Sequence, residues 1–211
     1  NSWGIAGSLQ NPLLLSSIKI EDDEDLIKRK LDFTARFIET FAVRRSVNYK
    51  KFGQTSIKYT MFNLIKLIRN NDLDKLGQNL LKETSEIEQK WSAMHDFGLH
   101  GQNRKFVKHL LSRISSHLDI IIGKDNNYVS YHNPNGRQFE IEHLWGNKFN
   151  EHKDEFEQEL DFQNWRNSIG GLVLLPNGTN QSFSSDKYED KIKHYQKENT
   201  YVQTLTNIYY E

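Results

Sequence analysis

The pattern of hydrophobic positions divides the chain into a helical N-terminal part and a C-terminal part with short strands. Between residues 22 and 122, apolar residues recur every three or four positions, as on the buried face of an amphipathic helix. This pattern predicts helices over residues 22–45, 55–71, 72–98 and 106–122, which together form a helical bundle. Residues 1–21 include Pro12 and show little periodicity, so we expect an N-terminal arm or linker there.

After residue 122 the period of the pattern changes. Residues 128–131 and 138–142 alternate as strands do, residues 172–175 form a short apolar run, and residues 186–197 and 201–210 again have helical spacing. We therefore expect an α+β fold that is mainly α. The bundle of residues 22–122 would be followed by a second domain, residues 123–211, built around short strands and closing helices.

Composition places the chain among globular proteins. Its 211 residues are 36% hydrophobic and 27% charged, and the longest apolar runs are far shorter than the roughly 20 residues of a membrane span. There is no cysteine, which excludes disulfides and thiolate zinc sites. We expect a cytoplasmic protein without membrane contact. The chain begins Asn-Ser-Trp-Gly without Met, which suggests a fragment of a longer protein.

Charge is balanced overall but unevenly distributed. Lys and Arg total 28, as do Asp and Glu, yet residues 40–71 contain seven basic residues and no acidic one. Such a basic block is typical either of a solvated helix surface or of phosphate contacts to a nucleic acid. The block predicts four DNA contacts: Arg44, Arg45, Lys50 and Lys51.

The most informative residues are Glu142 and His143, at the end of a predicted strand. Imidazole titrates near neutrality, so a histidine held by a strand is suited to take a proton from water. The Glu142 carboxylate and the Asn180 amide oxygen are hard ligands of the kind that bind Mg²⁺ or Mn²⁺. Asn167, just before the second strand, is placed to orient His143 by a hydrogen bond. Taken singly, each of these residues also fits an ordinary structural role.

Several motifs together resemble one known family. These are Phe106-Val-Lys-His-Leu-Leu-Ser-Arg-Ile114, Ile141-Glu-His143, the run Trp165-Arg-Asn-Ser-Ile-Gly-Gly-Leu-Val-Leu-Leu175, Asn180, and Lys187-Tyr-Glu-Asp-Lys191. They resemble the C-terminal HNH (His-Me finger) nuclease domain of GmrSD-type modification-dependent restriction endonucleases. The motifs lie within residues 100–197, and residues 22–100 share only the helical pattern.

The resemblance implies a ββα-metal finger that hydrolyses double-stranded DNA. In it His143 would be the general base, Asn167 its positioning residue, and Glu142 and Asn180 the ligands of Mg²⁺ or Mn²⁺. Lys191 matches a downstream lysine of the family, with either a phosphate or a structural role. The resemblance also implies an upstream nucleotide-hydrolysing sensor domain or subunit and a role in phage defence.

Two other functions remain open from the residues. The chain could be a catalytically inactive module that binds DNA or protein on the same scaffold. It could also be a toxin-like RNase that uses the same finger.

Overall fold

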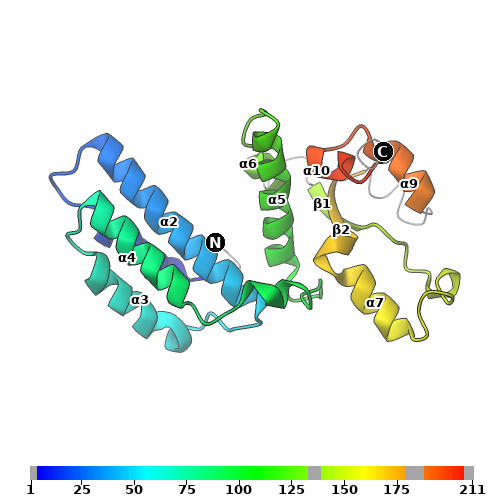
Figure 1. The fold of residues 1–211 in the computed structure, drawn as a ribbon, viewed down its shortest axis with the longest axis horizontal. Helices are drawn as coiled ribbons and strands as arrows, with labels where there is room; N and C mark the ends of the chain where they lie inside the picture. Colours follow the sequence, from blue (N-terminus) through cyan, green and yellow to red (C-terminus); the bar gives the residue numbers. More distant parts are fainter. Residues whose placement is uncertain (1–3, 133–138, 179–187, 207–211) are drawn as a thin grey trace. The chain divides into compact units, whose positions relative to one another are not determined.

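The computed structural model describes residues 4–132, 139–178 and 188–206, and the chain forms two compact units. The first unit covers residues 1–95 and the second residues 96–211. Helices are the main regular structure of both units, and one small antiparallel sheet lies in the second (Figure 1). The expected class, α+β and mainly α, is confirmed at this level.

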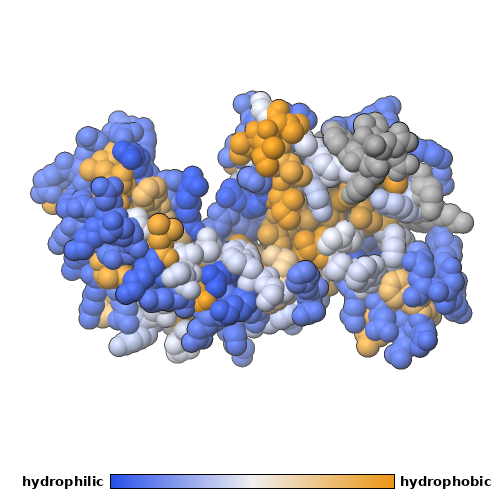
Figure 2. All heavy atoms as spheres, viewed as in Figure 1, coloured by the Kyte–Doolittle hydropathy of each residue, from blue (hydrophilic) through white to orange (hydrophobic). Residues whose placement is uncertain are grey.

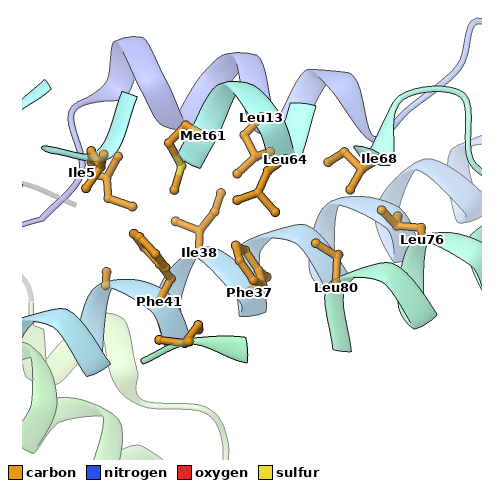
Figure 3. Packing of buried hydrophobic residues seen from close by; sticks show 13 residues of the cluster. Ile5, Leu13, Phe37, Ile38, Phe41, Met61, Leu64, Ile68, Leu76 and Leu80 are labelled. Carbon is orange, nitrogen blue, oxygen red and sulfur yellow. The ribbon is translucent and has the colours of Figure 1, made fainter. Parts of the chain in front are cut away.

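The first unit is a helical bundle around one apolar core. Its elements are α1 (Gly7–Ser16), α2 (Glu24–Val47), α3 (Gln54–Ile68), α4 (Leu73–Glu86) and the 3₁₀ helix η1 (Trp91–Met94). Asp23 and Asp72 cap α2 and α4, because each carboxylate accepts a hydrogen bond of 2.8 Å from a backbone N–H of the first turn. Phe37, Ile38 and Phe41 of α2 point toward Met61 and Leu64 of α3 in the core (Figure 3).

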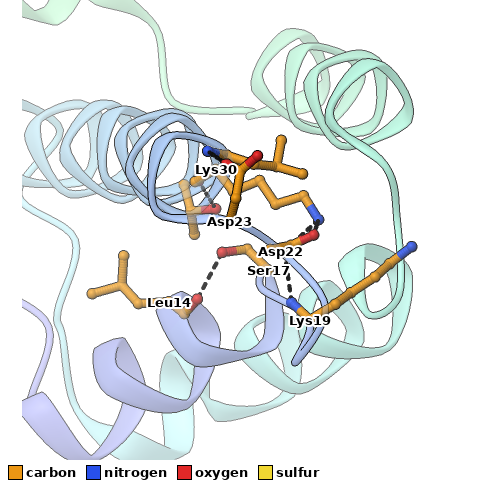
Figure 4. Close-up of polar contacts among 8 residues, drawn as sticks. Leu14, Ser17, Lys19, Asp22, Asp23 and Lys30 are labelled. Atoms are coloured by element: carbon orange, nitrogen blue, oxygen red, sulfur yellow. Dashed lines mark hydrogen bonds and ion pairs between the residues drawn. The ribbon is translucent and has the colours of Figure 1, made fainter.

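Within the segment for which the sequence predicts an arm, residues 7–16 form a packed helix, since α1 contacts α2 and α3. Leu13 of α1 is fully buried. Packing of the apolar side chains of α1 therefore stabilises a helix here despite its weak periodicity and the presence of Pro12. The turn after α1 is held by an ion pair in which Lys30 Nζ lies 2.9 and 2.7 Å from the two Asp22 oxygens (Figure 4). Both side chains are buried, and Asp22 also accepts a bond of 2.7 Å from the Lys19 N–H.

The second unit contains the sheet. Its first elements are α5 (Arg104–Ile121), α6 (Tyr128–His132), β1 (Phe139–His143), η2 (Phe149–Glu151) and α7 (Glu159–Asn167). They are followed by η3 (Ile169–Gly171), β2 (Leu172–Pro176), α9 (Tyr188–Tyr195) and α10 (Thr200–Gln203). β1 and β2 pair antiparallel, with Phe139 opposite Pro176 and His143 opposite Leu172.

One face of β2 packs into a core formed with the C-terminal helices. Val173 and Leu175 are fully buried there with Tyr195 of α9 and Val202 of α10. α5 packs against α6, α10 and β2. Its end and α6 carry apolar side chains that are about half exposed or more, which form a visible apolar patch in Figure 2: Ile120, Ile121, Ile122 and Val129.

Four of the expected boundaries differ from the structure. Residues 128–131 are helical in α6 rather than a strand, and the helix expected over 72–98 ends at Glu86. The helix of residues 104–121 belongs to the second unit, so the division falls after residue 95 and not after residue 122. The closing helix expected over 201–210 ends at Gln203 as α10, and residues 207–211 lie outside the described residues.

Candidate active site

His143 lies at the end of β1, where its side chain meets Asn167 from the end of α7. His143 Nε2 is 2.8 Å from Asn167 Oδ1. An amide oxygen only accepts hydrogen bonds, so this contact places the imidazole proton on Nε2 and leaves the lone pair on Nδ1. No hydrogen bond to Nδ1 occurs within the described part of the chain. The ring is thus oriented with one nitrogen available as a base.

The backbone of Asn167 is itself fixed by a neighbouring segment. The Leu99 N–H donates a hydrogen bond of 2.7 Å to the Asn167 carbonyl, and Gly98 forms an isolated antiparallel bridge with Ser168. A Cβ at Gly98 would lie 3.1 Å from the Asn167 oxygen, so glycine permits this close approach. The contact holds the end of α7 in place opposite β1.

The surroundings of His143 favour its neutral form. Burial is the largest cause, and together with the nearby charges of Arg166, Lys191 and Arg104 it lowers the pKa of His143 from 6.5 to about 4. The hydrogen bond with Asn167 acts in the opposite direction without reversing the shift. At neutral pH the imidazole is therefore unprotonated and able to accept a proton.

Glu142, the neighbour of His143, forms a buried ion pair with Lys191 of α9. Lys191 Nζ donates to Glu142 Oε1 at 2.7 Å and to the His143 carbonyl at 3.0 Å. The Lys191 residue is 0% exposed and Glu142 is 6% exposed. Of the two roles left open for Lys191, the structure favours the structural one. The burial of Lys191 argues against the expected phosphate contact, because a fully buried ammonium group has no surface to offer a DNA backbone.

A divalent cation would find one suitable oxygen in this pair. Lys191 occupies Oε1 of Glu142, while Oε2 accepts no hydrogen bond from any residue that the structure describes. A hard oxygen of this kind fits Mg²⁺ or Mn²⁺. Asn180, the second expected ligand, lies outside the described residues. Within residues 4–132, 139–178 and 188–206, no group of three or more His, Asp or Glu side chains is arranged to hold a metal.

Two arginines near His143 were not among the expected site residues. Arg166 precedes Asn167, is partly buried, and donates from Nε to the Trp145 carbonyl at 3.0 Å. Burial lowers its pKa, opposed by the charge of Glu142. Arg104 begins α5 and pairs with Glu140 of β1 at 3.1 Å. The sequence signal for Arg166 was its place beside Asn167, whereas Arg104 is brought to β1 only by the fold.

The basic block of the first unit separates into buried and exposed residues. Arg44 is 8% exposed, and its guanidinium group donates to the carbonyl oxygens of residues 84, 87 and 89 at 2.6–2.9 Å. Arg45 donates to the Lys51 carbonyl at 2.6 Å and lies over the rings of Phe41 and Phe52. These bonds occupy the Arg44 guanidinium group, which argues against the expected DNA contact of Arg44, whereas Arg45 is only partly buried and its DNA contact stays a prediction. Lys50 and Lys51 are exposed and stay candidates.

The fold and site define a mainly helical α+β domain with an oriented, neutral histidine at the end of a two-stranded sheet. Residues 43–210 match the family model of GmrSD restriction endonucleases, C-terminal domain. The chain belongs to this family, which confirms the resemblance found in the motifs. Searches of curated proteins and of solved structures gave no match.

Membership of the family sets the reaction class. The family is that of restriction endonucleases, which makes this chain a member of a family of nuclease effector domains. Enzymes of this kind act on DNA. In the part of the chain that the structure describes, no helix is long and apolar enough to cross a membrane.

Proposed function

We propose that this chain is a metal-dependent DNA endonuclease of the HNH type, with His143 as general base and Asn167 as its positioning residue. The observation that carries the proposal is the contact of 2.8 Å between His143 Nε2 and Asn167 Oδ1. It orients the ring, and the lowered pKa keeps the ring neutral. The chain order β1, β2, α9 also agrees with a ββα finger, with α7 inserted between the strands.

The chemistry of the proposal is hydrolysis of a phosphodiester. Nδ1 of His143 takes a proton from a water molecule as the water oxygen bonds to phosphorus. The bond from phosphorus to the 3′ oxygen breaks, and that oxygen then takes a proton from solvent. A general base held in this way contributes roughly 10²–10⁴ in rate.

Glu142, through Oε2, and Asn180 would hold Mg²⁺ or Mn²⁺ in this proposal. When bound, such an ion stabilises negative charge on the phosphate and on the leaving oxygen. The positive charges of Arg166 and Arg104, which lower the pKa of His143, favour the approach of an anionic backbone. Glu142 thus serves two partners, with Lys191 fixing one oxygen and leaving the other for the ion.

The proposal extends to the biological setting implied by the family. The substrate would be double-stranded DNA, and the chain would act as the effector of a modification-dependent restriction enzyme in phage defence. An upstream nucleotide-hydrolysing sensor domain or subunit would control it. These statements rest on family membership over residues 43–210.

Incubation of supercoiled plasmid with Mg²⁺ or Mn²⁺ tests the activity. Wild type should relax or linearise the plasmid, and His143→Ala should lose about 10²-fold or more of this rate because the general base is removed. His117→Ala is a matched control, because His117 is exposed on α5. Equal rates for wild type and His143→Ala would contradict the proposal.

Two further measurements, cleavage of RNA and binding of DNA, separate the two other functions. Cleavage of RNA but not of plasmid would favour a toxin-like RNase. Binding of DNA without any cleavage in either metal would favour the inactive binding module.

A further inference from the structure

The second unit contains a pocket of about 430 Å³ beside the ends of β1 and α7. Three aromatic residues, Trp145, Trp165 and Tyr188, line it together with Arg166 and Gly171. Its volume falls within the range of roughly 300–1,000 Å³ found for small-molecule sites. Of the residues that line this pocket, only Arg166 has been given a role so far.

The pocket is built from the immediate neighbours of the proposed catalytic pair. Trp145 is two residues after His143, and Arg166 directly precedes Asn167. The Arg166 Nε bond of 3.0 Å to the Trp145 carbonyl joins the two walls. The pocket walls are therefore continuous in sequence with His143 and Asn167, whose side chains contact each other.

The walls have a defined shape. The Trp145 ring is stacked with the His152 ring at 4.7 Å between centroids and 19° between planes, which fixes the indole. A Cβ at Gly171 would lie 2.7 Å from the Arg166 carbonyl oxygen, so η3 packs directly against the end of α7. Trp165, in contrast, is 62% exposed and does not belong to the core.

The chemistry of the lining selects a flat aromatic ligand next to an anion. Indole and phenol rings stack on nucleobases whatever the base sequence. No hydrogen bond or ion pair to the two terminal nitrogens of Arg166 occurs within the described ranges, and a guanidinium group is a strong phosphate ligand. A nucleotide has both parts, a planar base and a phosphate at a short distance from it.

We propose that this pocket receives one unstacked nucleobase of the DNA strand, adjacent to the phosphate presented to His143. The base stacks on Trp165 and Arg166 contacts the neighbouring phosphate. The inference rests on the proposed function, because it deepens the description of the same site. It makes Trp165 a substrate-binding residue that orients the strand.

Binding of two single-stranded oligomers tests the pocket. One is a 12-residue thymidine oligomer, and the other has the same length and the same phosphates but abasic sugars throughout. In the His143→Ala background, which prevents cleavage, the thymidine oligomer should bind about 5- to 150-fold more tightly, the range expected for stacking of a base on an aromatic side chain. Adding Trp165→Ala should bring the two affinities to within about twofold, and Trp165→Phe should restore part of the preference.

Trp91→Ala is the matched control, since Trp91 is a half-exposed tryptophan of the first unit and should leave the preference unchanged. Circular dichroism checks that each variant is folded. Equal affinity of the His143→Ala variant for both oligomers, or a base preference that remains after Trp165→Ala is added, overturns the proposal that the pocket binds a base.

The plasmid assay keeps the two proposals separate. Plasmid cleavage by the wild type combined with equal oligomer affinities removes only the base pocket. A base preference that depends on Trp165, without any cleavage, supports the pocket and removes only the nuclease.

Discussion

At the scale of single residues, the site depends on how the environment of His143 changes its pKa. Its sequence position beside Glu142 predicted a base, but an ordinary histidine is half protonated at pH 6.5. Burial and three cationic neighbours shift that balance toward the neutral ring. The consequence is a base that stays available under mildly acidic conditions.

This leads to a prediction about pH. In the free protein, NMR titration of the His143 ring should give a pKa of about 4, and Asn167→Ala should lower it further, because the Asn167 bond raises it. Single-turnover cleavage should therefore show no loss between pH 8 and 6 from protonation of His143. A pKa at or above 6.5 would contradict the environment described.

The lowered pKa of His143 also makes the stability of the folded chain depend on pH. The unfolded chain binds a proton at His143 near pH 6.5, whereas the folded chain does so only near pH 4. Acid therefore lowers stability through His143 as the pH falls from 6.5 to 4. The difference in unfolding free energy between wild type and His143→Gln should change over this window and be constant above it.

At the scale of elements, the Glu142 and Lys191 pair joins α9 to the end of β1. Both charges are removed from water, so each depends on the other. Lys191 also binds the His143 carbonyl, which ties the helix to the backbone of the base. A buried pair of this kind acts as a structural link whose loss leaves a charge without a partner.

We expect Lys191→Met to lower the free energy of unfolding by about 3 kcal/mol or more, because it leaves the Glu142 carboxylate buried and uncompensated. Urea denaturation measures the change. The double variant Glu142→Gln with Lys191→Met should recover a large part of the loss, since no isolated charge remains.

Lys193→Met is the control on the same helix. Lys193 pairs with Asp190 at 2.8 Å, but both side chains are more than half exposed, so its loss should cost far less stability than the loss of Lys191. Similar costs for Lys191→Met and Lys193→Met would disprove the structural role of the buried pair.

At the scale of the whole molecule, the two units have different proposed roles in the action on DNA. The second contains the candidate catalytic residues, and the first contributes exposed lysines of the basic block. The 56 acidic and basic residues balance to zero, so phosphate binding must depend on local exposure of charge and not on the total.

We predict that Lys50→Gln with Lys51→Gln weakens DNA binding and lowers the slope of log K against log salt by about 1–2, because each lost phosphate contact removes about 0.9. Arg44→Met should leave that slope unchanged while destabilising the bundle, because Arg44 binds backbone carbonyls. Salt titrations by fluorescence anisotropy measure both. A slope unaffected by the lysine changes would remove the first unit from the DNA interface.

Local patterns predicted the parts of the fold that depend on local interactions. The helices α3 and α5 and the strands β1 and β2 begin and end close to the expected residues, because their periodicity and flanking turn residues act over a few positions. The prediction of a strand over residues 128–131 was wrong, because alternation over four residues is too short to separate a helix from a strand. The sequence did not predict α1, because burial of Leu13 against the bundle outweighs the local sequence preference.

The sequence by itself determined the family, the fold class and the identity of the candidate base, because these follow from residue types in a fixed order. It also predicted Asn167 as the residue that orients His143, and the structure adds the contact of 2.8 Å. Only the tertiary structure decided the buried partners: Lys191 on Glu142, and the backbone carbonyls on Arg44. Lys191 and Glu142 are 49 positions apart, and Arg44 and Ile87 are 43 apart. Burial and charge pairing at such separations arise only when helices and strands pack, so spacing along the chain cannot predict them.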